Sequence, residues 1–280
     1  MLYIKVNKKD ADKVRKLLKE KDLLNNNYLT TSDNSFVYFP IKKYIDIGYE
    51  IIEKRGKRIE RFNLENLLKK YNIKSFSLDF YGNIAVIDVD KKYAKLIGDA
   101  IIKHYKRIKT VLLKCGAIKG IYRTRKFCFV SGEKNYIANY IENGCRFIFD
   151  IRKTYFSTRL AYERKRIYEM VNDKENVLVM FAGVGPFAIE IAKHKKAKVA
   201  AIELNKDAYR YMIKNIEINK VNVEAVLGDV KEVVYNYKDF ADRIVMPLPK
   251  DSYNFLDSCL IAAKDKCIVH YYAFGKIDNA

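Results

Sequence analysis

Residues 177–187 read VLVMFAGVGPF, and this stretch decides the fold. Its first four residues form a continuous apolar run, which is typical of a strand buried on both faces of a sheet. Gly183 and Gly185 follow, and glycine lets the backbone approach a ligand closely. Pro186 suits the first turn of a helix, because its missing N–H needs no partner there. The stretch therefore predicts a buried strand, a tight glycine turn and a helix whose N-terminus faces a ligand.

The same order of strand and helix recurs along the C-terminal half. We expect helices near 186–194, 206–219 and 251–263, and strands near 198–203, 222–227, 243–246 and 266–273. Such alternation predicts an α/β fold with a doubly wound, Rossmann-like parallel sheet. Glu203 ends the second strand, 20 residues after Gly183. A carboxylate in that place accepts hydrogen bonds from the hydroxyls of a ribose.

The glycine turn fits two classes of cofactor. Gly183, Gly185 and Glu203 also match a dinucleotide fingerprint. Two later features favour S-adenosyl-L-methionine over NAD: Asp229 follows the third strand, where a carboxylate holds an adenine amino group, and MPLP at 246–249 follows the fourth. A turn flanked by prolines makes a rigid wall against a planar base. The plainer interpretations are a helix cap for Asp229 and a strand-ending turn for 246–249.

Positive charge is concentrated in the first half of the chain. Lys and Arg number 54 against 34 Asp and Glu, a net charge of +20, of which residues 1–150 hold +15. Residues 101–130 carry nine basic and no acidic side chains, namely Lys103, Lys106, Arg107, Lys109, Lys114, Lys119, Arg123, Arg125 and Lys126. This favours a polyanionic partner, because each basic group near a phosphate releases a counterion, although basic faces also occur without one. We expect one continuous basic surface that reaches Arg123.

The pattern of strands and helices divides the chain into four parts. They are a small N-terminal domain at 1–44, a charged linker or connecting helix at 45–73, a middle α+β domain at 74–152 and the doubly wound domain at 153–280. In the middle domain, the strands at 127–130 and 145–150 are expected to complete one small sheet. The two small domains are candidates for RNA binding, since they hold most of the excess charge.

Several function classes are disfavoured by composition. The sequence contains no run of about 18 apolar residues, so no membrane span is predicted. The N-terminus lacks the apolar core of a signal peptide. The five cysteines form no C-x-x-C pair and the three histidines share no ligand spacing with them, which argues against a metal cluster and against a disulfide framework. We expect a cytoplasmic protein with reduced cysteines and no metal.

Four segments together resemble the archaeal and eukaryotic tRNA (guanine-37-N1)-methyltransferases. They are YFSTRLAYER at 155–164, MFAGVGPF at 180–187, DRIVMPLP at 242–249 and IVHYY at 268–272. RTR at 123–125, SGE at 131–133 and ENG at 142–144 match the middle domain of that family, and residues 1–40 its N-terminal domain. The resemblance implies a class I methyltransferase that uses S-adenosyl-L-methionine, preceded by two domains that hold the outer corner and the anticodon stem-loop of tRNA. We expect it to act as a monomer.

The resemblance also implies roles for single residues. Glu163 matches the proposed general base on guanine N1, and Arg123 the arginine that stabilises O6. The donor pocket is expected to include Tyr155, Phe181, Gly183, Gly185, Glu203, Asp229 and Pro247, and Pro247 also adjoins the reacting base. RNA contacts are expected from Arg123, Arg125, Arg159, Lys106, Arg107 and Lys109. Without the resemblance, Glu163 would as readily be a surface acid paired with Arg159 or Arg164, and Arg123 a phosphate contact.

Two positions depart from the family pattern. Val179 stands where an acid usually ends the first strand and orients the turn, and Pro247 replaces the asparagine of an Asn-Leu-Pro motif. The proline form resembles the archaeal branch that also methylates carbon 7 of 4-demethylwyosine. Three alternatives stay open: an aminocarboxypropyl transferase of wyosine synthesis, which shares the Met-Phe-Ala-Gly turn, a tRNA-binding protein without catalysis, and an NAD enzyme.

Overall fold

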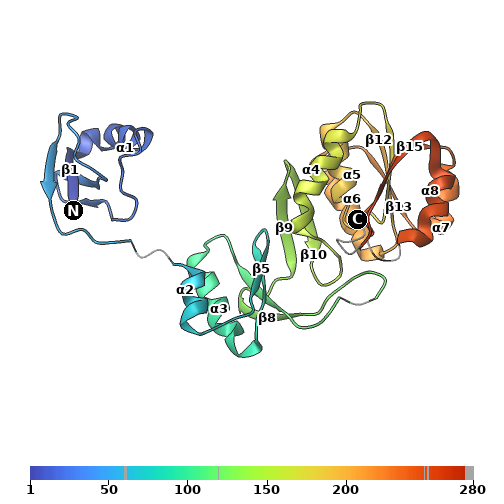
Figure 1. Ribbon diagram of the computed structural model, residues 1–280, viewed down its shortest axis with the longest axis horizontal. Helices are drawn as coiled ribbons and strands as arrows, with labels where there is room; N and C mark the ends of the chain where they lie inside the picture. Colours follow the sequence, from blue (N-terminus) through green and yellow to red (C-terminus); the bar gives the residue numbers. More distant parts are fainter. Residues whose placement is uncertain (60–61, 119, 249, 251, 275–280) are drawn as a thin grey trace. The chain divides into compact units, whose positions relative to one another are not determined.

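The computed structural model describes residues 1–59, 62–118, 120–248, 250 and 252–274. The chain forms two compact units, Met1–Lys70 and Tyr71–Ala280 (Figure 1). Lys119 of the expected basic surface and Pro249 of the expected proline wall lie outside the described residues. Within the described part, no helix is long and apolar enough to cross a membrane, and no group of three or more His, Cys, Asp or Glu side chains is arranged to hold a metal ion.

The first unit is an antiparallel sheet with one helix packed in its core. The helix α1 (Ala11–Glu20) buries Val14 and Leu18 together with Ile4 of the central strand, because positions four apart lie on one helical face. The sheet order is β2-β3-β1-β4. The remaining bounds are β1 Leu2–Asn7, β2 Thr31–Ser32, β3 Phe36–Pro40, β4 Glu50–Glu53 and α2 Leu64–Lys70.

The segment 45–73 is more ordered than a linker. Its residues 50–53 form β4, which pairs with β1 along the edge of the first sheet. The charged ends of this strand, Glu50 and Glu53, are exposed, while Ile51 and Ile52 between them are half-buried. An edge strand tolerates this composition because only part of its surface meets the core.

The second unit begins with a four-stranded sheet of order β5-β6-β7-β8. Helix α3 (Lys91–His104) connects the parallel strands β6 and β7 and buries Ile97 and Ile101. Asp90 caps this helix by accepting a hydrogen bond from the backbone N–H of Lys92. The strands are β5 Ser77–Tyr81, β6 Ile84–Asp88, β7 Thr110–Lys114 and β8 Phe127–Gly132.

A hairpin of β9 (Ile137–Glu142) and β10 (Cys145–Asp150) follows as a separate two-stranded sheet. The prediction that 145–150 joins 127–130 in one sheet is therefore wrong. The reason lies in β10, whose Phe147 and Phe149 are buried in a core that includes Val86 of the middle sheet and Val184 beyond β11. The hairpin thus fills the space between two sheets instead of extending one of them.

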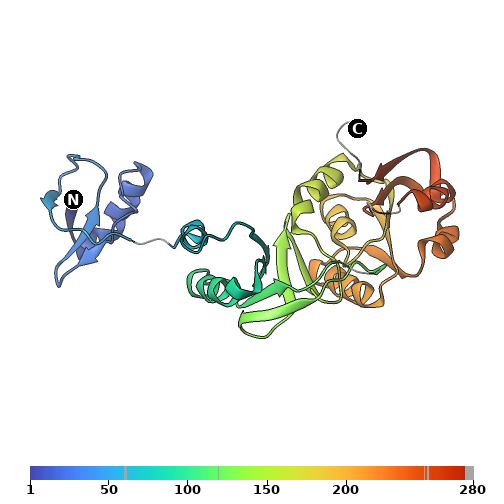
Figure 2. The ribbon, with the colours of Figure 1, turned by 60° about the horizontal axis from the view of Figure 1, so that its bottom comes forward.

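The rest of the chain contains the predicted parallel sheet, whose five strands lie in the order β13-β12-β11-β14-β15. Helices α4, α5 and α6 cover one face, and α7 and α8 cover the other (Figure 1, Figure 2). The strands are β11 Asn176–Met180, β12 Lys198–Glu203, β13 Val223–Leu227, β14 Ala241–Met246 and β15 Ala263–Tyr271. The helices are α4 Ala161–Met170, α5 Pro186–His194, α6 Lys206–Asn219, α7 Val230–Val233 and α8 Leu256–Ala262.

Two asparagines of α6 bind the hairpin to this sheet. Asn215 accepts from the backbone N–H of Ile148 at 2.8 Å, and Asn219 accepts from and donates to the backbone of Arg146 at 2.8 and 2.7 Å. The backbone of β10 is thereby satisfied by side chains instead of a third strand. The hairpin 137–150 is therefore bonded to α6 and shares its core with the middle sheet.

Candidate active site

The glycine turn after β11 opens the carboxyl edge of the parallel sheet. Phe181, Gly183 and Gly185 have positive φ angles of 56°, 60° and 88°. A Cβ on Gly185 would lie 2.9 Å from side-chain atoms of both Ile189 and Met212, so only glycine fits there. A Cβ on Gly183 would meet nothing nearer than the Tyr155 carbonyl oxygen at 3.7 Å. The turn therefore presents open backbone beside Tyr155, as a ligand cradle requires.

Glu203, at the end of β12, holds this turn in place. Its Oε2 accepts a hydrogen bond from the Gly183 N–H at 2.6 Å, and its Oε1 accepts one from the Asn205 N–H at 2.7 Å. Burial raises the pKa of Glu203, while these backbone donors act in the opposite direction. The backbone N–H of Leu204 acts in the same way. A carboxylate offers about four acceptor positions, so one is left for a further donor such as a ribose hydroxyl.

Val179 lies fully buried, one residue before the end of β11. It belongs to the apolar core on the face covered by α4, α5 and α6. An acid at this position is therefore not what orients the turn in this chain, because Glu203 supplies that hydrogen bond from the neighbouring strand. The turn is therefore held by Glu203 although Val179 stands where the family usually has an acid.

Three further residues of the predicted donor pocket follow the carboxyl ends of strands in the parallel sheet. Asp229 accepts a hydrogen bond from the Lys231 N–H at 2.9 Å and caps α7, which is the plainer of its two interpretations. The Phe181 ring meets the Phe255 ring edge-on, with 4.7 Å between centroids. Pro247 is half-buried directly after β14. The parallel order of the strands places all three at one edge of the sheet.

Arg123 reaches this edge from the middle domain. Its guanidinium lies 5.1 Å from the centre of the Tyr155 ring, in a cation–π contact. The residue has a φ of +52°, and among the described residues its buried Nε has no hydrogen-bond partner. Since buried polar atoms are nearly always paired, this nitrogen is suited to an incoming acceptor.

A disulfide between Cys115 and Cys128 closes the segment that carries Arg123. The prediction that all cysteines are reduced is therefore wrong. The cause is the register of the sheet: β7 and β8 pair Leu113 with Cys128, which brings Cys115 near its partner, with 5.8 Å between the two Cα atoms. Cys145, Cys259 and Cys267 are free.

A cavity of about 310 Å³ lies beside Tyr155, lined by the middle sheet and by residues 151–159. Arg123 and Arg125 line it, together with Arg159. Arg159 is an expected RNA contact, but its Nη2 is paired with Asp79 Oδ1 at 2.9 Å. Burial would raise the pKa of Asp79, yet Lys114 and Arg159 together lower it.

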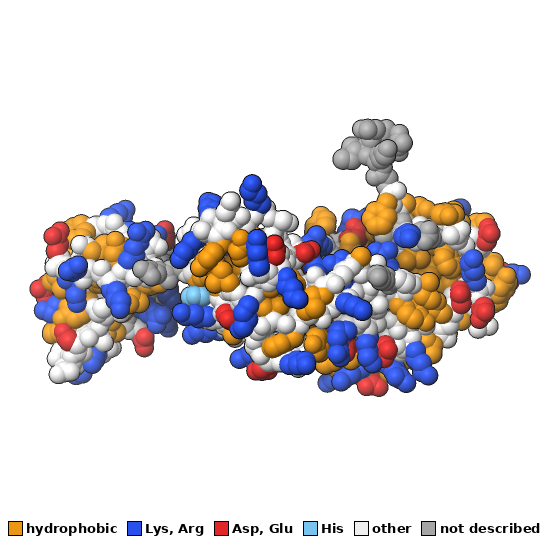
Figure 3. All heavy atoms as spheres, turned by 90° about the horizontal axis from the view of Figure 1, so that it is seen from below, with side chains coloured by type: hydrophobic (Ala, Val, Ile, Leu, Met, Phe, Trp, Pro, Cys, Tyr) orange, Lys and Arg blue, Asp and Glu red, His pale blue; other side chains and the backbone are white. Residues whose placement is uncertain are grey.

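Lys106, Arg107 and Lys109 are exposed in the loop between α3 and β7. This loop precedes β7, whereas Arg123 and Arg125 lie beyond its other end. Five residues of strand separate the two groups by roughly 16 Å. That the two groups belong to one continuous basic surface stays a prediction. Figure 3 shows Lys and Arg side chains dispersed among acidic and apolar ones on the face it presents.

Glu163 lies in the first turn of α4, with 22% of its side chain exposed. Its ion-pair partner is Arg166, with Nη2 2.7 Å from Oε1, and not Arg159 or Arg164. Tyr272 donates its hydroxyl to the same Oε1 at 2.5 Å. The hydrogen bonds from Arg166 lower the pKa of Glu163 against the opposing effect of burial, and Tyr272 adds to the lowering.

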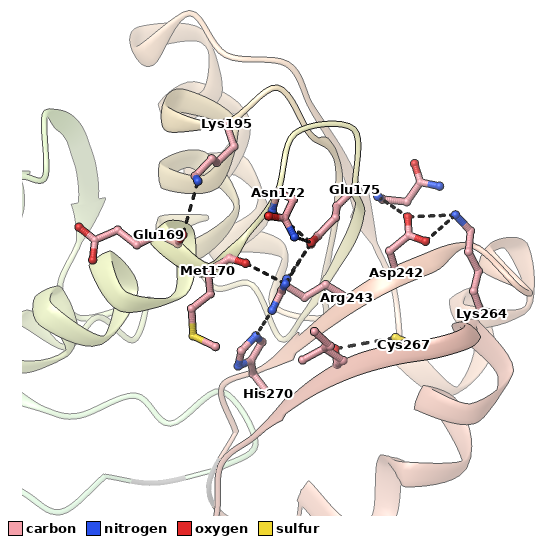
Figure 4. A network of polar contacts seen from close by, with 12 residues as sticks. Glu169, Met170, Asn172, Glu175, Lys195, Asp242, Arg243, Lys264, Cys267 and His270 are labelled. Carbon is pink, nitrogen blue, oxygen red and sulfur yellow. Dashed lines mark hydrogen bonds and ion pairs between the residues drawn. The ribbon is translucent and has the colours of Figure 1, made fainter.

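A second network lies at the other end of α4 from Glu163, where β11 and β14 begin. Arg243 of β14 donates to both Glu175 oxygens, from Nε at 2.7 Å and from Nη2 at 3.0 Å, and also meets His270 Nε2 at 2.8 Å (Figure 4). Its Nη2 donates to the Met170 carbonyl as well, at the end of α4. Arg243 is almost fully buried, so these contacts tie α4 to β14 and β15.

A model of the TRM5/TYW2 methyltransferase domain matches residues 138–279, and one of the tRNA methyltransferase 5 N-terminal domain matches residues 4–50. The chain belongs to the TRM5/TYW2 methyltransferase family. It is 38% identical to the tRNA (guanine(37)-N(1))-methyltransferase Trm5b of Pyrococcus abyssi, over 98% of this chain and 84% of that protein.

Two further members of the TRM5/TYW2 family extend the comparison. The tRNA (guanine(37)-N(1))/4-demethylwyosine(37)-methyltransferase Taw22 of Nanoarchaeum equitans is 33% identical over 71% of this chain and 84% of its own length. The structure described as the complex of aTrm5 and tRNALeu superposes with a TM-score of 0.75 at 34% identity, covering 98% of this chain and 88% of that one.

Sequence reasoning missed Arg166 and Tyr272 as partners of Glu163. Arg166 follows Glu163 by three residues on one helix, and this spacing predicts an ion pair once the helix is recognised. Tyr272 is 109 residues away from Glu163 in sequence, so only the folded chain brings the two together.

Proposed function

We propose that this member of the TRM5/TYW2 family methylates N1 of guanosine 37 in tRNA, with S-adenosyl-L-methionine as methyl donor. One observation carries the proposal: Arg123 lies on the Tyr155 ring, and the Tyr155 carbonyl borders the Gly183 turn. An RNA-facing cation and a donor cradle therefore share one aromatic residue. The identity to Trm5b relatives supports the choice of base.

The residues present fit the donor. The open backbone at Gly183, the Glu203 carboxylate, the Phe181 ring and Asp229 would hold its ribose and adenine, and Tyr155 and Pro247 would close the pocket. The bound donor would supply a methyl group carried by a sulfonium sulfur. When the methyl group is transferred, the sulfur keeps the bonding electron pair and leaves as a neutral thioether. Positioning then provides much of the rate, because the methyl group is already activated.

Guanine N1 carries a proton and needs help to become a nucleophile. In the proposed step Glu163 accepts this proton as general base, and the N1 electron pair forms the new bond to the methyl carbon. Charge that develops on O6 is stabilised by the Arg123 guanidinium, whose Nε lacks a partner among the described residues. The target base lies in a loop, so moving it out of the stack costs little.

We also propose the division of labour along the chain. Residues 1–44 would hold the outer corner of tRNA, with 45–73 supplying β4 to their sheet and then the connection, and 74–152 would contact the anticodon stem-loop while 153–280 carry out the methyl transfer. Arg125, Arg159, Lys106, Arg107 and Lys109 would meet RNA phosphates. The enzyme would act as a monomer in the cytoplasm, where its substrate is found.

A second substrate is 4-demethylwyosine at the same position, methylated on carbon 7. Pro247 and the similarity to Taw22 support it, because a site that accepts a tricycle gains from giving up a polar contact. Methylation of tRNA that carries 4-demethylwyosine tests this activity directly. Methyl transfer to guanosine alone would reject the second substrate, and addition of an aminocarboxypropyl group, which mass spectrometry separates from a methyl group, would reject both.

The decisive test is methylation of a tRNA transcript with guanosine at position 37, located by mass spectrometry. In single-turnover reactions, Glu163→Gln should lower the rate by about a hundredfold or more, since general bases contribute at least that much. Glu169→Gln is the matched control, because Glu169 is an exposed acid on the same helix. If calorimetry detects no binding of S-adenosyl-L-methionine, the proposed methyltransferase activity is wrong and a tRNA-binding protein remains. If Glu163→Gln keeps the full rate, only the role of Glu163 as general base is wrong.

A further inference from the structure

The Glu163 carboxylate is held on one side by two neighbours. Arg166 grips it with two hydrogen bonds, from Nε to Oε2 at 2.8 Å and from Nη2 to Oε1 at 2.7 Å. Tyr272 adds a third, from its hydroxyl to Oε1 at 2.5 Å. Oε1 thus accepts two hydrogen bonds from these neighbours and Oε2 accepts one.

A carboxylate offers about four acceptor positions, two on each oxygen. Both positions on Oε1 are taken, so the remaining one lies on Oε2. We propose that Tyr272 and Arg166 are the positioning residues of Glu163, which occupy Oε1 and leave Oε2 as the atom that receives the guanine proton. This inference rests on the proposed role of Glu163 as general base and names the residues that direct it.

Tyr272 is itself held rigidly enough for this task. It directly follows Tyr271, which pairs with Met246 at the end of β14, next to Pro247. Its carbonyl oxygen accepts a hydrogen bond from the buried Ser252 hydroxyl at 3.0 Å, and its ring lies 6.3 Å from that of Phe187 in the first turn of α5. Tyr272 therefore links Glu163 to the helix that begins at the glycine turn.

The charged and titratable groups around Glu163 make Tyr272 a fixed donor. Burial and the nearby Glu163 carboxylate raise the pKa of Tyr272, so its hydroxyl keeps its proton. His270, in β15 two residues before Tyr272, has a pKa lowered to about 4 by burial and by Arg243 and Arg166, so it is neutral at neutral pH. Of Arg166, Arg243 and His270, Arg166 is the cation that forms an ion pair with Glu163.

The test is the pH dependence of single-turnover methylation from about pH 4 to about pH 9, with saturating tRNA and donor, because the lowered pKa of Glu163 places the acidic limb below about pH 4.5. Tyr272→Phe keeps the ring and removes one hydrogen bond to the ionised carboxylate. The rate should fall roughly tenfold, the affinity for tRNA should stay unchanged, and the acidic limb of the profile should move to higher pH, because the pKa of Glu163 rises. Tyr271→Phe, its exposed neighbour, is the matched control.

Arg166 provides an independent arm. Arg166→Gln should move the acidic limb further than Tyr272→Phe, because Arg166 is the larger cause of the lowered pKa of Glu163. Arg166→Lys keeps the positive charge and should recover part of the shift. This exposed position on α4 carries the test if Tyr272→Phe does not fold.

The outcomes separate the two proposals. A loss of rate in Tyr272→Phe that is equal at every pH would show a merely structural role and overturn the inference, as would an unchanged rate. In both cases, if Glu163→Gln is inactive, the proposed role of Glu163 as general base stands. An active Glu163→Gln would instead overturn the base itself, whatever Tyr272→Phe does.

Discussion

Two charged clusters on helix α4 use the same kinds of side chain in opposite ways. Arg164 is 2% exposed, and its Nε lies 2.6 Å from Glu142 Oε1 and 3.5 Å from Glu190 Oε1. Glu163, the preceding residue, keeps 22% of its side chain exposed and is paired with Arg166, whose side chain is 45% exposed. One face of α4 is therefore an internal anchor, and the next carries a partly exposed carboxylate.

The difference shows that burial, and not residue type, decides what an ion pair does. The internal cluster joins β9, α4 and α5, and Arg164 also donates from Nη2 to the Ser157 carbonyl at 2.9 Å. That hydrogen bond holds the segment that runs from Tyr155 into α4. Ions taken out of water are costly unless every partner is present, whereas a half-exposed pair can be altered at little cost to stability.

The largest expected effect comes from breaking the internal cluster. Arg164→Met leaves the buried Glu142 carboxylate without its cation, beside the buried Glu190 carboxyl group, and should lower the free energy of unfolding by about 3–5 kcal/mol at neutral pH. Urea titrations at several pH values measure this loss, which should shrink under acidic conditions as the carboxyl groups take up protons. Lys165→Met, at the exposed neighbouring position, should have little effect. A loss as small as that of Lys165→Met would contradict the distinction between the clusters.

A smaller effect concerns Glu190, whose pKa is raised by burial. The folded state therefore holds this proton more tightly than the unfolded state, so stability falls as pH rises from the ordinary carboxyl pKa through the raised one. Glu190→Gln removes the titration and should flatten this fall, by an amount on the order of 1 kcal/mol. Glu169→Gln serves as the exposed control, and an unchanged pH dependence in Glu190→Gln would show that the raised pKa does not govern stability.

The smallest effect on stability is expected at Arg166. Arg166→Gln should change the free energy of unfolding by less than about 1 kcal/mol, because exposed ion pairs contribute little. The same variant is expected to shift the pH profile of methylation, so stability and rate respond to different clusters of one helix. A loss comparable to that of Arg164→Met in urea titrations would mean that both clusters are structural.

Much of the fold was predictable because it depends on local pattern. The apolar run at 177–180, the glycines and Pro186 specify strand, turn and helix within a few residues, and α5 begins at Pro186 as predicted. The placement of β10 was not predictable, since alternating residues such as Phe147 and Phe149 indicate a buried strand without naming its partner. The Cys115–Cys128 disulfide likewise depends on the register between β7 and β8.

The residues of the candidate site divide in the same way. Gly185 and Glu203 were identifiable because their spacing around a buried strand reflects what a nucleotide-like ligand requires. The sequence by itself therefore determined the class of sheet, the position of the glycine turn and the excess of charge in the first half. Only the tertiary structure decided that Glu203 holds the turn, that the basic residues fall at two ends of β7, and that Tyr272 meets Glu163. These contacts join segments far apart in the chain, and their geometry is set by packing that no local pattern encodes.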